Sequence, residues 1–176
     1  MKHFLFALIL VFIPFTGFSQ SDSLSANRII LSIGLSGNQS KASSFFNTQL
    51  RFGIERNSYL YYSRVTFGGK SDMWTTPDES YLEMGILIGK SFKQLDNLSL
   101  AIGIGVVQGI YRGDKMFSDN FLTTSYKKIE YDELGFPIEV NYNFPSFSKF
   151  KFGVSLNSNI NREYTNYGFS IHIGIN

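Results

Sequence analysis

Apolar and polar residues alternate with a period of two along most of the chain from about residue 29 onward. In 98–106, for example, five large apolar residues occupy every second position, and Ser, Ala or Gly fill the positions between them. Successive side chains of a β-strand point to opposite faces, so each such run predicts a strand with one apolar face. The pattern predicts eight strands, over 29–36, 46–55, 59–67, 82–89, 98–106, 136–144, 150–157 and 167–175.

The second face of these predicted strands is composed mainly of Gly, Ser, Asn, Thr and Gln, with few charges. A soluble β-sandwich would carry many Lys, Glu and Asp residues on that face. The interior of a barrel of about eight strands, in contrast, has room only for side chains. We therefore predict that the second face lines the inside of a closed barrel. Its ionisable residues are expected to form a polar network there, and they are Arg51, Arg64, Glu83, Glu139, Lys151 and His172.

Short and long connections alternate along the chain. The short ones are predicted at 56–58, 93–97 and 145–148, and the long ones at 37–45, 68–80, 113–132 and 158–166. Outer-membrane barrels have this asymmetry, with short periplasmic turns and long external loops. The sequence therefore predicts an all-β fold, an eight-stranded antiparallel up-and-down transmembrane β-barrel.

Residues 1–19 have the features of a cleaved secretory signal peptide. Lys2 lies in a short polar start, 4–15 are almost entirely apolar, and small residues follow at two positions one apart. The apolar run is too short for a membrane-spanning helix of about 20 residues. We expect export and a mature barrel domain over 20–176, located in the outer membrane of a Gram-negative bacterium.

Composition agrees with a barrel whose two faces differ. Charged residues make up 17% of the chain, compared with about 25% in a typical soluble domain, and aromatic residues make up 16%. The mean hydropathy is close to zero, as expected when every second strand residue faces a polar interior. The aromatic residues are expected in two girdles, Phe46, Phe67 and Tyr167 at the loop ends and Tyr59, Tyr61, Tyr142, Phe144 and Phe150 at the turn ends.

Several classes of protein do not fit this composition. The chain has no Cys, which excludes a disulfide scaffold, a zinc finger and a cysteine-dependent enzyme. The net charge of +2 gives no indication of a nucleic-acid partner. The predicted mature chain contains a single His and no acidic cluster with metal-ligand spacing, so we expect neither a metal nor a cofactor.

One predicted strand carries a family resemblance. The segment Tyr81-Leu82-Glu83-Met84-Gly85-Ile86-Leu87-Ile88-Gly89-Lys90 resembles the Tyr-Leu-Glu-x-Pro-x-x-x-Lys strand of the PorT-like outer-membrane β-barrel proteins. Gly85 stands where Pro is usual in that family. The resemblance extends to the architecture of the whole mature chain, and it implies an outer-membrane location rather than a shared activity.

The long loops are the candidate functional regions, because binding residues concentrate on loops held by a rigid scaffold. Six residues of the second and third long loops are candidates for binding, namely Trp74, Phe117, Phe121, Tyr126, Lys127 and Lys128. We expect a non-enzymatic protein with a structural, binding or assembly-accessory role and no open pore. The expected partners are outer-membrane lipid, the barrel-assembly machinery during biogenesis, and an extracellular or envelope protein.

Two alternatives remain open from the sequence. In the first, the protein is an outer-membrane lipid-modifying enzyme in which His172 acts with Ser170 and with Glu83 or Glu139. In the second, it is a soluble periplasmic carrier of the lipocalin type, whose Leu and Ile faces point inward around a small apolar ligand.

Overall fold

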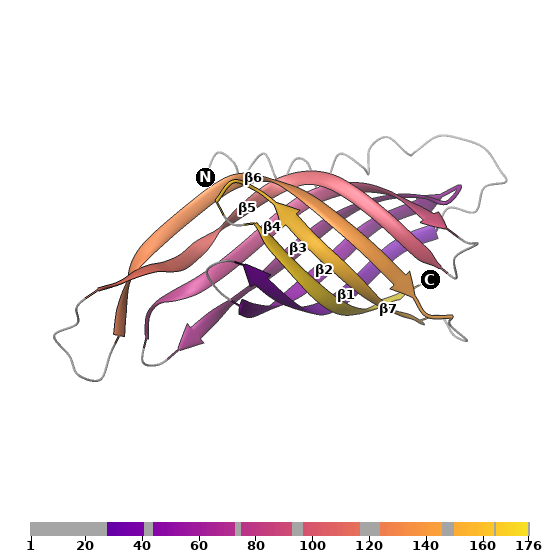
Figure 1. Cartoon of the computed structure of the whole chain (residues 1–176). Helices are drawn as coiled ribbons and strands as arrows, with labels where there is room; N and C mark the ends of the chain where they lie inside the picture. Colours follow the sequence, from indigo (N-terminus) through magenta and orange to yellow (C-terminus); the bar gives the residue numbers. More distant parts are fainter. Residues whose placement is uncertain are drawn as a thin grey trace.

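Eight antiparallel strands close into a barrel in the computed structural model of the chain (Figure 1). The structure describes residues 28–40, 44–72, 75–92, 97–116, 124–145, 150–163 and 165–175. The predicted signal peptide at 1–19 lies outside these residues. Within the described ranges, no helix is long and apolar enough to cross a membrane.

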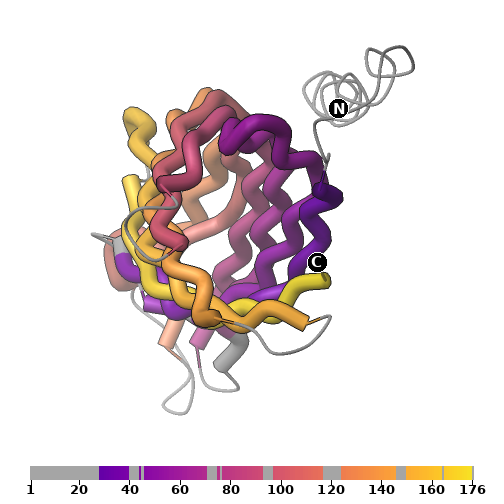
Figure 2. The backbone as a smooth tube through the Cα atoms, turned by 90° about the vertical axis from the view of Figure 1, so that its right-hand side faces the viewer, coloured from indigo at the N-terminus to yellow at the C-terminus, as the bar shows by residue number. Residues whose placement is uncertain are grey.

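Each strand pairs with its neighbour in the chain, and the first strand pairs with the last. The strands are β1 (Arg28–Ser40), β2 (Ser44–Arg56), β3 (Tyr59–Asp72), β4 (Thr75–Phe92), β5 (Leu98–Met116), β6 (Thr124–Asn143), β7 (Phe150–Ile160) and β8 (Asn166–Ile175). Leu31 on β1 lies opposite Ile175 on β8, which closes the sheet into the ring seen along the barrel in Figure 2. The predicted eight-stranded antiparallel up-and-down barrel is therefore confirmed.

The β2–β3 hairpin shows how the short connections work. Asn57 and Ser58 have φ angles of 51° and 68°, and Arg56 and Tyr59 are directly paired. Two consecutive residues with positive φ form the tight turn whose twist matches that of the adjoining strands. Asn tolerates this conformation better than most residues. The turn predicted at 56–58 is confirmed. This end of the barrel, where the short connections lie, is called the turn end below.

The strands at the other end, called the loop end, are longer than predicted. β4, β5 and β6 contain 18, 19 and 20 residues, and the connection expected over 113–132 is strand as far as Met116 and again from Thr124. Figure 1 shows these strands projecting beyond the rest of the barrel. The prediction of a twenty-residue loop was wrong because the outward positions of the extension are polar, as at Glu130 and Asp132. A strand that is polar on its exposed face gives no alternating apolar signal.

Large apolar side chains cover the outside of the barrel. Their exposed fractions reach 61% at Ile102 and 71% at Leu35. The same outward orientation holds on neighbouring strands, since Ile88, Ile102 and Ile138 lie side by side in the register. The lipocalin alternative required these faces to point inward, so the structure overturns it.

The interior is lined by small and polar residues together with a few apolar ones. Tyr62 and Leu87 contribute to one small buried cluster, and Tyr81 and Val107 to another. Close approach between strands requires Gly at some positions: a Cβ on Gly105 would lie 2.3 Å from the carbonyl oxygen of Met84. Side chains thus fill the central part of the barrel and the part toward the loop end.

Aromatic residues lie on the outer face toward both ends. At the loop end, Phe46, Phe67 and Tyr167 have 85%, 44% and 57% of their surface exposed. At the turn end, Tyr59, Phe144 and Phe150 are similarly exposed, and Tyr61 and Tyr142 are half-buried. The Lys90 ammonium lies 5.8 Å from the centre of the Tyr59 ring. This arrangement matches two girdles separated by an aliphatic band.

Candidate functional site

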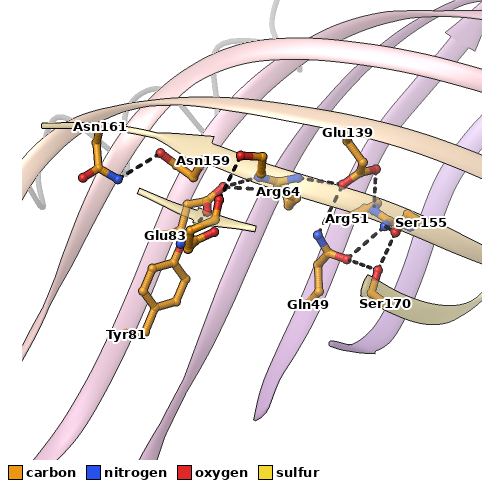
Figure 3. Close-up of polar contacts among 12 residues, drawn as sticks. Gln49, Arg51, Arg64, Tyr81, Glu83, Glu139, Ser155, Asn159, Asn161 and Ser170 are labelled. Carbon is orange, nitrogen blue, oxygen red and sulfur yellow. Dashed lines mark hydrogen bonds and ion pairs between the residues drawn. The ribbon is translucent and has the colours of Figure 1, made fainter. Parts of the chain in front are cut away.

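A buried carboxylate, Glu139 on β6, organises the centre of the barrel (Figure 3). One of its oxygens forms an ion pair with Arg51 Nε at 3.0 Å, and the other accepts a hydrogen bond from Arg64 Nη1 at 2.8 Å. They also accept from the Tyr62 hydroxyl at 3.0 Å and from Asn141 Nδ2 at 2.7 Å. Charged and neutral groups from β2, β3 and β6 itself therefore converge on one carboxylate, as a desolvated charge requires.

Arg64 continues the network toward the loop end. Its Nε and Nη2 atoms both donate to Glu83 Oε1, at 3.1 and 2.5 Å. The second oxygen of Glu83 accepts from the Tyr81 hydroxyl at 2.5 Å, and that hydroxyl accepts from Asn166 Nδ2 at 2.6 Å. Arg64 is therefore held between two carboxylates from different strands, and the chain of contacts crosses the interior from β6 to β8.

A second branch runs from Arg51 to strands β7 and β8. Arg51 Nη2 donates to Gln49 Oε1 at 2.9 Å and to Ser155 Oγ at 2.7 Å. Ser170 Oγ donates to the same Gln49 oxygen at 3.1 Å and contacts the Ser155 hydroxyl. Gln49 Nε2 in turn lies 3.3 Å from Glu139 Oε2. Figure 3 shows this branch meeting the Glu139 carboxylate.

The charges of this network balance. The four charged members, Arg51, Arg64, Glu83 and Glu139, have only 1–5% of their surface exposed. Two guanidinium groups are matched by two carboxylates, so the interior carries no net charge from them. Because the groups span the barrel from wall to wall, they tie the strands together and fill the passage between the two ends.

The six ionisable residues predicted inside the barrel do not form a single cluster. The structure brings Arg51, Arg64, Glu83 and Glu139 together, as described above. Lys151 lies instead at the beginning of β7, half-buried and close to the turn end. His172 on β8 is buried, with Nε2 3.2 Å from Asn143 Oδ1.

The His172 and Ser170 side chains are each bound to other residues. Ser170 contacts Gln49 and Ser155, and the His172 ring contacts Asn143. The proposed catalytic pair therefore does not form in this structure. Among the described residues, no group of three or more His, Cys, Asp or Glu side chains is placed to hold a metal ion.

Sequence reasoning missed the uncharged members of the network. These are Gln49, Tyr62, Tyr81, Asn141, Ser155, Asn166 and Ser170. The sequence did contain a signal for them. Each occupies an inward-facing position of its strand, as the charged members of the network do. Tyr62, for example, is two residues from Arg64, and Tyr81 is two residues from Glu83.

At the loop end, Arg112 connects β5 to the beginning of β4. Its Nε donates to the Pro77 carbonyl at 2.8 Å, and its Nη2 donates to the Thr75 carbonyl at 3.3 Å. Its backbone N–H donates to Glu79 Oε1 at 3.2 Å. The guanidinium also lies 5.9 Å from the centre of the Tyr126 ring. This side chain thus links the two projecting hairpins, which also pair directly where β4 runs parallel to β6, with Thr75 opposite Thr124.

The six predicted binding residues divide between described and undescribed parts of the chain. Trp74, Phe117 and Phe121 lie outside the described residues. Tyr126, Lys127 and Lys128 lie on strand β6, so their placement in a loop was wrong, for the reason given above for the whole extension. Lys127 and Lys128 are exposed, and Tyr126 is half-buried beside Arg112.

Lys128 also has a local partner. Its Nζ lies 2.6 Å from Glu130 Oε1 on the same strand. The hydrogen bond and the positive charge of Lys128 lower the pKa of the Glu130 carboxyl below its usual value. Both side chains are largely in solvent, so the pair adds little to stability.

Replacing Arg112 with alanine is expected to loosen the projecting strands without unfolding the barrel. Losing hydrogen bonds from a charged donor should lower the local opening free energy by about 1–3 kcal/mol. Hydrogen exchange at 75–80 and 124–128 should become faster, whereas exchange near Arg64 should not change. Lys127→Ala is the matched control on the same extension. Unchanged exchange at 75–80 in the Arg112 variant would show that the contacts to Pro77 and Thr75 do not hold the hairpins.

A closed barrel with an apolar exterior and a filled polar interior defines a class, the small eight-stranded outer-membrane barrels. Neisserial surface protein A, whose crystal structure belongs to this class, is similar to the chain with a TM-score of 0.62. The sequences are 7% identical, and the match covers 87% of this chain and 99% of that one.

Two further solved structures have the same fold. The Yersinia pestis attachment invasion locus protein Ail has a TM-score of 0.55 at 12% identity, covering 86% of this chain and 99% of that one. The N-terminal β-barrel domain of Pseudomonas aeruginosa OprF has a TM-score of 0.51 at 10% identity, covering 85% and 98%. No protein-family model matches the chain, and no curated protein sequence matches it. At these identities the likeness concerns the fold alone.

Proposed function

We propose that the chain is a non-enzymatic outer-membrane β-barrel protein of the PorT-like kind, exported by a signal peptide at 1–19. The barrel anchors the projecting strands β4, β5 and β6, which serve as an external surface for a structural or binding role. The main support for the proposal is the apolar outer face of the barrel.

That exterior would be unfavourable in water. Ile102 and Ile88 are adjacent on the outer face and have 61% and 55% of their surface exposed. Soluble monomers rarely expose continuous apolar patches of more than a few hundred Å². In a bilayer the same side chains contact acyl chains, and the aromatic residues at both ends lie at the level of the headgroups.

The projecting strands supply the surface on which a partner would bind. They combine exposed cations at Lys127 and Lys128 with the half-buried ring of Tyr126, which lies beside the Arg112 guanidinium. Arg112 gives this surface a fixed shape through its contacts to Pro77 and Thr75. Lipid headgroups and an envelope or extracellular protein are the partner classes that suit it, and Trp74, Phe117 and Phe121 are candidates in the same part of the chain.

Single cysteines introduced into the cysteine-free chain test this orientation in cells. Lys127→Cys, on the projecting strands, should react with a bulky membrane-impermeant maleimide in intact cells. Pro145→Cys, exposed at the turn end, should react only after the cells are broken. The unsubstituted chain gives the background. Labelling of Pro145→Cys but not of Lys127→Cys in intact cells would contradict the proposed orientation.

The filled interior predicts that the protein does not conduct ions. Planar bilayers containing the purified chain should show no stepwise conductance, because the Arg64 guanidinium and its two carboxylate partners occupy the centre of the barrel. The general porin of a Gram-negative outer membrane serves as the conducting control. Steady ohmic conductance of the folded chain would contradict a closed interior.

A further inference from the structure

A polar cavity of about 500 Å³ lies inside the barrel at the turn end. Its inner wall includes Arg51 and Asn141, which belong to the central network, and its outer part reaches the strand ends at Ser91 and Ile175. The volume falls within the range of small-molecule binding sites. Figure 2 views the barrel from this end.

The cavity has an excess of positive charge. Arg28, exposed at the first position of β1, and Lys151, half-buried at the second position of β7, both line the cavity near its mouth. Neither takes part in an ion pair within the part of the chain that the structure describes. Glu55 is the acidic residue that lines the cavity, whereas Arg51 is already matched by Glu139. Two cations therefore share one carboxylate around an interior space, which favours an anion there.

Two buried acceptor atoms in the cavity wall lack partners among the described residues, Asn141 Oδ1 and His172 Nδ1. The orientation of the Asn141 amide is fixed, because its Nδ2 donates to Glu139 Oε1. His172 Nε2 lies beside Asn143 Oδ1, an acceptor, so Nε2 carries the proton of the neutral ring and Nδ1 accepts. Buried acceptors without donors are costly, so these two atoms suit hydroxyl groups of a ligand.

We propose that this cavity binds a small anion that carries hydroxyl groups, of the glycerol phosphate or sugar phosphate class. The anionic group lies between Arg28 and Lys151, and the hydroxyl groups donate to Asn141 and His172. The cavity lies inside the barrel wall, whereas lipid headgroups surround the outer face, so the ligand comes from solution. This site is at the opposite end from the proposed external surface and does not depend on it.

Titration of the purified, folded chain in nonionic detergent tests the site with three probes. Glycerol 3-phosphate is expected to bind with one-to-one stoichiometry and to shift the NMR signals of the His172 ring and the Asn141 amide. Inorganic phosphate should bind about tenfold more weakly, and glycerol should not bind detectably. Absence of saturable binding, or equal affinities for glycerol 3-phosphate and phosphate, would overturn the proposal.

Substitutions test separately the cationic part of the site and the part that accepts hydrogen bonds from the ligand. Lys151→Ala should weaken glycerol 3-phosphate binding about tenfold, and Lys151→Arg should retain it. His172→Phe should weaken glycerol 3-phosphate but not inorganic phosphate, since only the former donates to Nδ1. Lys127→Ala, at the loop end, is the control. Each variant is first shown to fold by its mobility on an unheated gel. Unchanged binding by Lys151→Ala would overturn the site even though the fold and the membrane location remained intact.

Nanodiscs distinguish a soluble ligand from a lipid. The headgroup of phosphatidylglycerol carries the two glycerol hydroxyl groups of glycerol 3-phosphate, with a phosphodiester in place of the phosphomonoester. The His172 signals should be identical in phosphatidylglycerol and phosphatidylcholine nanodiscs, and they should shift in both when glycerol 3-phosphate is added. A shift caused by phosphatidylglycerol alone would assign the cavity to a lipid headgroup and overturn the soluble ligand.

Discussion

Replacing Glu139 with glutamine is expected to destabilise the folded barrel by about 3–5 kcal/mol, the cost of breaking a buried ion pair by removing one partner. Glu139 forms ion pairs with both Arg51 and Arg64, at 3.0 and 2.8 Å, and all three side chains are buried. The substitution leaves Arg51 without a carboxylate and Arg64 with Glu83 alone. The free energy of unfolding should be measured by denaturant titration in lipid vesicles, followed by circular dichroism.

Two further variants separate charge from other effects. Glu130→Gln, at an exposed carboxylate on the same strand, should leave the unfolding free energy unchanged within error. Arg51→Gln combined with Glu139→Gln should be more stable than the sum of the single effects predicts, because the double variant removes one charge of each sign. Strictly additive effects would show that the two charges are not energetically coupled.

An arginine at position 102 is expected to destabilise the barrel by about 2–4 kcal/mol in a bilayer, as found for cations placed at the midplane on the lipid side of membrane barrels. Ile102 is central to the apolar run of β5 and lies between Ile88 and Ile138 on the outer face. In water, the same Ile102→Arg change would replace an exposed apolar residue by a charged one at little cost. Unfolding measured in vesicles distinguishes the two situations.

The matched control lies on the same strand and face. Gln108 is six residues nearer the loop end, beyond the apolar run, and pairs with Asp132. Gln108→Arg should therefore change the unfolding free energy in vesicles much less than Ile102→Arg. Equal effects of the two substitutions would mean that the outer face at Ile102 is not in a hydrocarbon environment.

Much of the fold could be predicted from the sequence because the two faces of each strand differ so strongly in chemistry. In 98–106 the alternation indicates both the strand and the side that faces outward, and the structure agrees at Ile102 and Ala101. The same parity places Arg64 and Glu83 inside. Once eight strands and short turns are accepted, antiparallel closure follows, because an open sheet would leave two unpaired edges.

The partners inside the barrel could not be predicted, because they depend on the closed geometry. Arg64 and Glu139 are 75 positions apart in the chain, and only the strand stagger of the closed ring brings them within 2.8 Å. The alternation along a strand indicates whether a residue faces inward or outward, but not where it lies along the barrel axis. For this reason the sequence groups Lys151 with the central charges, although it lies at the turn end beside Arg28 and Glu55.

The projecting strands were missed for a different reason. An alternating pattern is visible only where the two faces of a strand differ in polarity in the usual way, and beyond the apolar band the outer positions of β5 and β6 become polar, as at Gln108, Glu130 and Asp132. The backbone pairing continues there, with Ile110 opposite Glu130 and Arg112 opposite Lys128. Backbone hydrogen bonds leave no trace in side-chain hydropathy, so a polar strand and a polar loop look alike in the sequence.

Membrane fractionation combined with gel mobility tests the central claim, that this chain spans the outer membrane as a closed barrel. Cells expressing the chain are separated into periplasmic, inner-membrane and outer-membrane fractions, and each is run on a gel in dodecyl sulfate with and without boiling. A barrel with the apolar exterior seen at Ile88 and Ile102 predicts recovery in the outer membrane and a mobility that changes on boiling. Recovery in the soluble periplasmic fraction, with the same mobility before and after boiling, would contradict it.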